Sequence, residues 1–299
     1  MSARRITLAT RKSPLALAQA RAFVAELRAH HPELVVEELL VTTTGDRIQD
    51  RPLSEVGGKA LFVKEIEEAL FDGRADFAVH SLKDVPAFLP DGLVIGCVPR
   101  REDPRDVLVS KSGALLVDLP AKSRIGTSSL RRKLQLLALR PELEVLPIRG
   151  NVDTRLRKAE SGEVDAIVLA RAGLIRLGFT ARETEVLSVE AMIPAVAQGA
   201  LGIEHRADDA ALHELLAPLS HQETKISVTA ERAVLRVVEG NCQLPVAAHA
   251  VLGESTITLV GLLAEPDGSR VRRAQVQSSW PLSEADAVAL GEELGRRLR

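Results

Sequence analysis

The sequence predicts an α/β protein with two related domains, followed by a smaller α+β domain. In the first part of the chain, short apolar strands alternate with amphipathic helices, which is typical of a sheet covered by helices. The same order of strand, hydroxyl-bearing turn and helix recurs further along the chain. The last part carries strand-like segments joined by short turns between two helices, a pattern that favours an antiparallel sheet.

The first predicted domain begins with a strand at Ile6–Thr10 and a helix that starts at Ser13–Pro14. Serine is a preferred N-cap, and proline is a preferred first helical residue. A second strand is expected at Val35–Thr43 and a third at Asp76–His80. Between these strands, Gly57–Gly58 is expected to open another helix. The apolar face of that helix comprises Phe62, Ile66, Ala69 and Leu70.

The second predicted domain repeats this order. A turn rich in hydroxyl groups leads into a helix at Leu130–Leu139, and a strand is expected at Val145–Arg149. A further helix follows Asn151. The segment Gly162–Val168 is similar to Gly73–Val79 of the first domain. Two related α/β domains are therefore expected, although the identity between them is low.

The third predicted domain starts with a helix that runs through Thr229–Val238. Strands are expected at Val246–Leu252, Thr256–Ala264 and Arg270–Val276, and Ser283–Leu298 closes the chain as a helix. The chain is expected to cross between the first two domains near residues 99–104 and 193–202. The predicted boundaries are 1–99 with a return at 200–217 for the first domain, 100–199 for the second and 218–299 for the third.

The composition of the chain disfavours several classes of function. The 299 residues carry a formal charge of −2 and only 2% aromatic residues, which disfavours broad binding to a polyanion and base-stacking platforms for nucleic acids. No apolar run is long enough for a membrane helix, and the first residues lack the apolar core of a secretory signal. Neither the two cysteines nor the seven histidines show metal-ligand spacing. We expect a cytoplasmic protein without metal, nucleic acid or membrane.

Arginine accounts for 30 of the 39 basic residues. This excess is either a codon bias or a need for forked guanidiniums that bind carboxylates or phosphates. Position favours the second interpretation, because cations and hydroxyls gather at the expected strand-to-helix turns, where free amides and the helix dipole attract anions. These residues are Arg11, Ser13, Thr127, Ser129, Arg131, Arg132, Arg149 and Arg155. The sequence therefore predicts a small polyanionic ligand at the edges where α/β proteins bind ligands.

Three further residues are candidates on weaker grounds. Asp84 precedes Val85–Pro86, so its loop is expected to be stiff. Because it also follows a strand, it is expected to face the arginine-lined edge. The nearby His80 is as consistent with a structural role as with a functional one. Cys242 lies in a polar loop, whereas Cys97 lies in an apolar strand and is expected to be a buried filler. A loop cysteine is an inert thiol, a nucleophile or an attachment point, and spacing alone does not decide among these.

Six motifs together give the sequence a family resemblance. They are ATRKSPLALAQ at 9–19, GGKALFVKE at 57–65, HSLKDVP at 80–86, GTSSLRR at 126–132, IRGNVDTRL at 148–156 and GNCQLP at 240–245. In this order they resemble the porphobilinogen deaminase (hydroxymethylbilane synthase) family. The resemblance implies two periplasmic-binding-protein-like α/β domains around a cleft and a smaller α+β domain with a three-stranded antiparallel sheet that carries the cofactor.

The resemblance also assigns roles to individual residues. It implies that Cys242 holds a dipyrromethane cofactor through a thioether and that Asp84 is the catalytic aspartate. Cofactor-binding positions are Ser81, Lys83, Thr127, Ser129, Arg131, Arg132 and Arg155. Substrate-binding positions are Arg11, Ser13, Lys59, Phe62, Arg149, Arg155 and Arg176. Two residues depart from the family pattern, Ala60 and Asn241, and neither departure removes a charged group.

The implied reaction joins four porphobilinogen molecules head to tail on the dipyrromethane primer, with loss of ammonia, and water then releases the linear tetrapyrrole hydroxymethylbilane. Because each pyrrole carries two carboxylates, the arginine excess has a physical reason. A monomeric enzyme is expected. An anion-binding module and a cysteine hydrolase that uses Cys242 are the alternatives, and only the deaminase requires a covalent dipyrrole on the purified protein.

Overall fold

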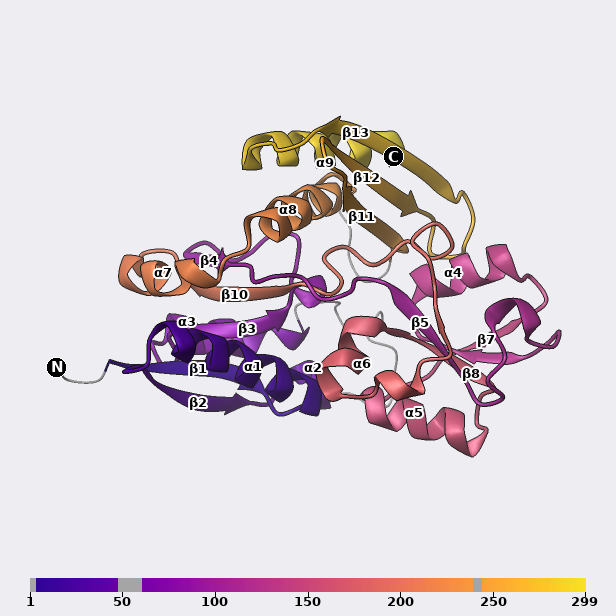
Figure 1. Cartoon of the computed structure of the whole chain (residues 1–299), viewed down its shortest axis with the longest axis horizontal. Helices are drawn as coiled ribbons and strands as arrows, with labels where there is room; N and C mark the ends of the chain where they lie inside the picture. The colour runs from indigo at the N-terminus through magenta and orange to yellow at the C-terminus, as the bar shows by residue number, and fades with distance from the viewer. Residues whose placement is uncertain (1–3, 48–60, 239–243) are drawn as a thin grey trace. The chain divides into compact units, whose positions relative to one another are not determined.

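The first sheet holds five strands in the order β2-β1-β3-β10-β4 (Figure 1). The computed structural model describes residues 4–47, 61–238 and 244–299. β1 pairs in parallel with β2 and β3, whereas β10 is antiparallel to β3 and β4. The elements of this region are β1 (Arg5–Arg11), α1 (Pro14–His30), β2 (Val35–Val41), α2 (Thr44–Arg47), α3 (Lys64–Phe71), β3 (Phe77–Ser81), a 3₁₀ turn (Leu82–Asp84), β4 (Leu93–Cys97), β10 (Leu201–Arg206) and α7 (Ala210–Leu216).

Alternating side chains place helices on both faces of this sheet. Ile6 and Leu8 of β1 belong to a buried cluster with Phe23 of α1, whereas Ala9 of β1 belongs to a second cluster with Ile66 of α3. Since successive strand residues point to opposite faces, α1 covers one face and α3 covers the other. The carboxyl ends of the parallel strands β1 and β3 lie at the same edge of the sheet.

The second sheet repeats the same topology in the order β7-β6-β8-β5-β9. β6 is parallel to β7 and β8, and β5 is antiparallel to β8 and β9, as β10 is in the first sheet. The predicted relation between the two α/β parts is thus visible in strand order. The elements are β5 (Asp106–Ser110), β6 (Arg124–Gly126), α4 (Leu130–Leu139), β7 (Glu144–Leu146), α5 (Val152–Ser161), β8 (Ala166–Ala170), α6 (Arg171–Leu177) and β9 (Glu185–Val186).

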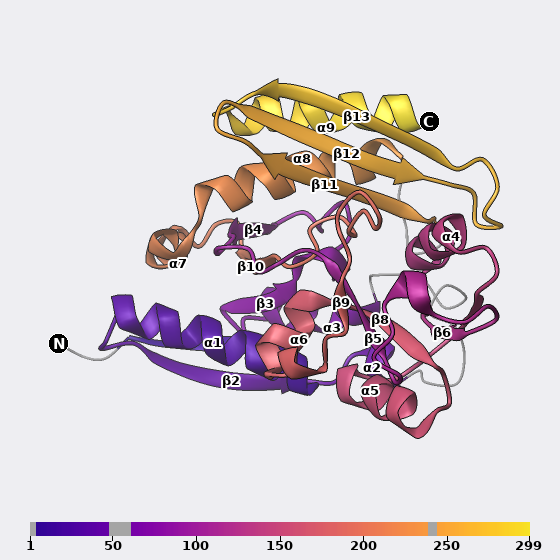
Figure 2. The ribbon, with the colours of Figure 1, turned by 45° about the vertical axis from the view of Figure 1, so that its right-hand side comes forward.

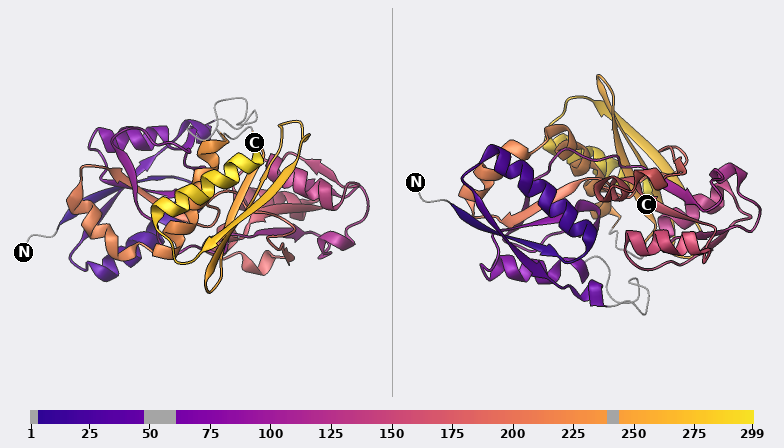
Figure 3. Two further views of the ribbon diagram at one scale, coloured as in Figure 1. Left: turned by 90° about the horizontal axis from the view of Figure 1, so that it is seen from above. Right: turned by 60° about the horizontal axis from the view of Figure 1, so that its bottom comes forward.

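A separate antiparallel sheet follows in the order β11-β12-β13, with α9 packed on β12 and β13 (Figures 2 and 3). The tight contact between α8 and α9 requires glycine at Gly291, because a Cβ there would lie 2.1 Å from the Ala230 carbonyl oxygen. The predicted fold class, two α/β sheets and a three-stranded α+β part, is confirmed. The elements are α8 (Gln222–Val237), β11 (Val246–Leu252), β12 (Thr256–Leu263), β13 (Arg272–Ser279) and α9 (Glu284–Leu298).

Contacts within the chain define two compact units. Unit 1 comprises residues 1–101 and 200–225, and unit 2 comprises residues 102–199 and 226–299. The chain changes unit after residues 101, 199 and 225, and the last of these changes lies outside the two expected crossing segments. The three-domain boundaries given above stay a prediction. Within the described residues, none of the helices combines the length and apolar character that a membrane crossing needs.

Several predicted boundaries were wrong, among them the strand predicted at Arg270–Val276, which is β13 at Arg272–Ser279. The predicted strand 145–149 ends at Leu146, because Pro147 has no N–H for the ladder, so Arg149 lies in the following loop. α8 begins at Gln222, earlier than the apolar spacing indicated. α3 begins at Lys64, and Phe62 precedes the helix instead of lying on its buried face, because its ring covers the guanidinium of Arg11. The expected opening at 57–58 lies outside the described residues.

Candidate active site

The edge of the first sheet forms a pocket in unit 1. Arg11 ends β1 and Ser81 ends β3, and both line this pocket together with Ser13, His80 and Asp84. The structure therefore brings together the side chains that the sequence placed at the ends of parallel strands. Phe62 also lines the pocket.

Local bonds fix the turn that carries Asp84. After β3 the chain forms a 3₁₀ turn over Leu82–Asp84, and the Leu82 N–H donates to the Ala200 carbonyl at 3.0 Å. Val85 has extended backbone geometry, as expected for a residue before proline. The carboxylate of Asp84 makes no hydrogen bond or ion pair to the side chains of residues 4–47, 61–238 and 244–299. A rigid turn thus presents a carboxylate at the pocket wall.

Arg11 is held from two sides. Its guanidinium donates through Nε to Asp46 at 3.1 Å and forms a second bond to the same carboxylate through Nη2. The guanidinium also lies 4.4 Å from the centroid of the Phe62 ring. Burial opposes ionisation of Asp46, but Arg11 holds the pKa of that carboxyl below its usual range. Any acidic ligand at Arg11 therefore shares this cation with Asp46.

Sequence reasoning did not single out Gln19. This residue lies in α1, is buried, and its side-chain amide donates to the Ser81 hydroxyl at 2.9 Å. It lines the same pocket as Arg11 and Asp84. The available signal was a polar residue inside the apolar stripe of α1, one position before the buried Ala20.

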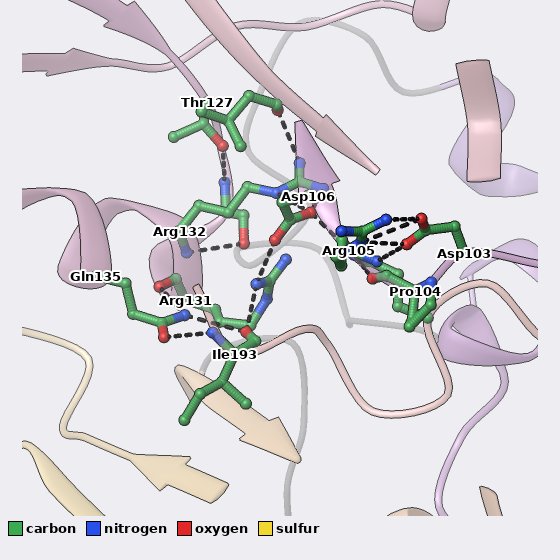
Figure 4. Close-up of polar contacts among 12 residues, drawn as sticks. Asp103, Pro104, Arg105, Asp106, Thr127, Arg131, Arg132, Gln135 and Ile193 are labelled. Carbon is green, nitrogen blue, oxygen red and sulfur yellow. Dashed lines mark hydrogen bonds and ion pairs between the residues drawn. The ribbon is translucent and has the colours of Figure 1, made fainter. Parts of the chain in front are cut away.

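Unit 2 contains a buried ion cluster at the start of α4 (Figure 4). Arg131 donates through Nη1 to Asp106 at 2.7 Å, and Arg132 donates to the same carboxylate at 3.1 Å and 2.8 Å. Asp106 is fully buried, and both arginine side chains are under 10% exposed. Two guanidiniums thus share one carboxylate.

Further bonds complete this cluster. Arg131 also donates to the Ile193 carbonyl at 2.7 Å, and the Gln198 amide donates to Asp106 at 2.9 Å. Burial alone would raise the pKa of Asp106, but the two guanidiniums hold it far below its usual range. Sequence reasoning missed Asp106. Its only signal was an acidic residue at the head of the apolar run Val107–Val109.

Hydroxyl groups cap α4 beside this cluster. Ser129 is the N-cap, and its hydroxyl accepts from the Arg132 N–H at 3.4 Å. Thr127 is buried, and its hydroxyl accepts from the Ser129 N–H at 3.2 Å. The positive end of the helix dipole therefore adds to the charge of the arginines at this position.

Arg155 extends the cationic region. It lies in the first turns of α5, and its Nε donates to the Gly150 carbonyl at 2.9 Å. Burial, together with the nearby charges of Arg132 and Arg149, lowers the pKa of Arg155 to about 10. Repulsion among these three guanidiniums is the electrostatic signature of a site for anions.

Arg176 lies in α6 and contacts a segment where the chain changes from one unit to the other. Its guanidinium donates to the Gly199 carbonyl at 2.7 Å, and burial lowers its pKa to about 10 although Glu102 opposes this shift. Gly199 has φ of +87°, and a Cβ there would lie 2.4 Å from the Glu102 carbonyl oxygen. Only glycine fits this close approach of the two crossing segments.

Four of the predicted residues lie outside the described residues, namely Lys59, Ala60, Asn241 and Cys242. Lys83 lies between Leu82 and Asp84 in the 3₁₀ turn.

Cys97 is fully buried, and burial raises the pKa of its thiol to about 12, which confirms that it fills space in the core as expected. The described residues contain no group of three or more His, Cys, Asp or Glu side chains arranged to hold a metal ion.

The fold and these sites define a two-sheet α/β protein whose strand ends are suited to small, multiply acidic ligands. Residues 6–214 match the family model described as "Porphobilinogen deaminase, dipyromethane cofactor binding domain", and residues 225–299 match "Porphobilinogen deaminase, C-terminal domain". The chain belongs to the porphobilinogen deaminase family.

Curated relatives agree with this assignment. The porphobilinogen deaminase of Sorangium cellulosum is 58% identical over 294 residues, which cover 98% of each chain. That of Nitratidesulfovibrio vulgaris is 52% identical over 296 residues, or 99% of this chain and 93% of the relative.

More distant solved structures include two periplasmic binding proteins. An aliphatic sulphonate binding protein from Escherichia coli is 13% identical with a TM-score of 0.40, and the match covers 78% of this chain and 70% of that one. A solute binding protein from Desulfovibrio salexigens is 12% identical with a TM-score of 0.45, and the match covers 74% of each chain. Likeness at this level adds nothing to the argument.

Proposed function

We propose that this protein is a hydroxymethylbilane synthase. It deaminates four porphobilinogen molecules and joins them head to tail on a dipyrromethane primer, then releases hydroxymethylbilane by hydrolysis. Membership of the porphobilinogen deaminase family supports this activity. The structural observation that carries it is the cationic region of unit 2, where Arg131 and Arg132 share Asp106 and two further arginines lie nearby.

The side chains of this region fit a dipyrromethane. Each of its two pyrroles carries two carboxylates, and a guanidinium fork is the protein group best suited to bind carboxylates. The lowered pKa of Arg155 reflects burial and the repulsion of neighbouring guanidiniums, which a bound anion relieves. Arg131, Arg132, Arg155, Thr127 and Ser129 are the proposed cofactor-binding residues of unit 2. Ser81, Lys83 and a thioether at Cys242 complete the proposed set.

The dipyrromethane supplies the free pyrrole α-carbon that accepts each new unit. Porphobilinogen loses ammonia, which leaves with the electron pair of the C–N bond, and the remaining pyrrole becomes cationic. Asp84 is the catalytic residue, because its carboxylate at the pocket wall stabilises that cation and its N–H. With the dipyrromethane bound, Asp84 would accept the proton that the pyrrole α-carbon releases when the next unit is joined.

Residues around the pocket position the incoming substrate. Arg11 and Ser13 at the end of β1 bind its carboxylates, and Phe62 holds the Arg11 guanidinium in place. Arg149, Arg155, Arg176 and Lys59 complete the proposed substrate-binding set. Since Asp46 already occupies one edge of Arg11, a substrate carboxylate competes with it for that cation.

Intact mass and product analysis test the function. The purified protein should carry the added mass of one dipyrromethane, consume porphobilinogen, and release four ammonia molecules for each hydroxymethylbilane. An anion-binding module would carry no covalent pyrrole and consume nothing. A cysteine hydrolase would likewise lack that mass and would cleave acyl substrates instead. Either result contradicts the proposal.

We also propose that the enzyme is a cytoplasmic monomer that binds neither nucleic acid nor membranes. The near-neutral formal charge of −2 and the scarcity of aromatic residues support the absence of a nucleic-acid partner. Sedimentation of the holoenzyme should give the mass of one 32.3 kDa chain. A dimer at micromolar concentration would contradict the monomer.

A further inference from the structure

A buried pair of ionisable side chains lies at the pocket of unit 1. His80 of β3 and Glu204 of β10 meet at 2.9 Å, and their side chains are only 5% and 1% exposed. His80 itself lines the pocket beside Asp84.

The buried His80–Glu204 pair is expected to stabilise the fold less than two apolar residues of similar volume would. Burying charged groups is expensive, and apolar residues of similar volume are often neutral or better for stability. The second oxygen of Glu204 has no hydrogen-bond partner among the residues that the structure describes. A costly buried pair in the wall of a reaction pocket is better explained by a role in the pocket than by the stability of the core.

The pair is tied to the turn that carries Asp84. His80 is the residue before Ser81, the last residue of β3, and it is opposite Gly202 in the register with β10. The Leu82 N–H donates to Ala200, just before β10 begins. The end of β3 is therefore fastened to β10 by a main-chain bond after His80 and by the His80–Glu204 contact.

We propose that His80 and Glu204 are positioning residues that hold the Asp84 turn in its reactive geometry. The proposal rests on the function proposed above. Displacement of a catalytic group by about 1 Å is enough to lower a rate by about 10²-fold.

Two variants of the holoenzyme test the proposal, Glu204→Gln and His80→Gln, each of which removes one partner of the pair. The matched control is Glu68→Gln, the same substitution on the exposed side of α3, where Glu68 lies near Lys64. For each protein we would measure kcat and KM for porphobilinogen from pH 5.5 to 9 and the dipyrromethane mass.

The expected results separate positioning from folding. Glu204→Gln and His80→Gln should retain the cofactor and a near wild-type KM while kcat falls by about 10- to 100-fold. Glu68→Gln should keep the wild-type kcat. Unchanged kcat in a folded Glu204→Gln protein would overturn the proposal.

Failure of the proposed function would be recognised separately. In that case the wild-type protein itself would lack the dipyrromethane mass and would not consume porphobilinogen, and the positioning role would fall with it. If Glu204→Gln does not fold, His80→Gln decides, because it also removes the contact between His80 and Glu204.

Discussion

Removal of the Asp106 charge should be among the most damaging single changes in unit 2. Asp106→Asn keeps the size of the side chain but leaves the guanidiniums of Arg131 and Arg132 without their buried anion. Asp106 is 0% exposed, and Gln198 donates to it as well. Loss of one partner of a buried ion cluster costs about 3–5 kcal/mol. For a chain of 299 residues that unfolds as one unit, that corresponds to a fall in Tm of roughly 5–8 °C.

Thermal unfolding of the holoenzyme measures this effect. The matched control is Asp165→Asn, because Asp165 and its partner Arg124 are each 41% exposed and exposed pairs contribute little. The pKa of Asp106 lies below its unfolded value, so its stabilisation is present above about pH 4 and is lost only as the pH falls further. The Tm difference should therefore be the same at pH 5 and pH 8.

A folded Asp106→Asn protein that melts within 2 °C of the Asp165→Asn control would refute the reasoning. A second readout is cofactor content by intact mass. Because the variant changes the orientation of both arginines at the start of α4, the fraction of chains that carry a dipyrromethane should fall. Full loading together with normal stability would show that neither guanidinium depends on Asp106.

The remaining predictions concern attachment, chemistry and pH. Cys242→Ser should lack the dipyrromethane mass, whereas Cys97→Ser should retain it, and a normal holo mass in Cys242→Ser would rule out that attachment. Asp84→Asn should retain the cofactor but lose about 10²–10³-fold in single-turnover ammonia release, and Asp84→Glu should retain part of the rate; wild-type turnover by the Asn variant would remove Asp84 from the mechanism. The pKa of Glu67 is raised to about 7 in the fold, so stability falls as the pH rises from about 4 through 7, and Glu67→Gln should melt above wild type at pH 8 but not at pH 5.

Local signals in the sequence were sufficient for most helix and strand boundaries. Ser129 caps the predicted helix Leu130–Leu139 through a bond to its own third residue, a contact that depends only on neighbours in sequence. The same holds for Ser13 and for the capping box of Ser283 with Asp286. Arg149 was misplaced because a single proline ended the strand earlier than the apolar pattern indicated.

The spacing of residues in the sequence could not predict hydrogen-bond partners that lie far apart along the chain. Asp106 binds arginines 25 and 26 positions away, and Glu204 binds His80 at a separation of 124 residues. Each partner is an ordinary polar residue in its own segment, and only the sheet order brings them together. The sequence therefore predicted which basic residues lie at the candidate sites, but not which carboxylates bind their side chains.

The two units differ in how their arginines are balanced. In unit 1 the guanidinium of Arg11 is already matched by Asp46, and the pocket wall adds the carboxylate of Asp84. In unit 2 Arg131 and Arg132 share the single carboxylate of Asp106. An acidic pyrrole gains most from the second environment, whereas a pyrrole that becomes cationic when ammonia leaves gains most from the first. Tetrapyrrole assembly needs both, because its intermediates carry many carboxylates and its reacting carbon is transiently positive.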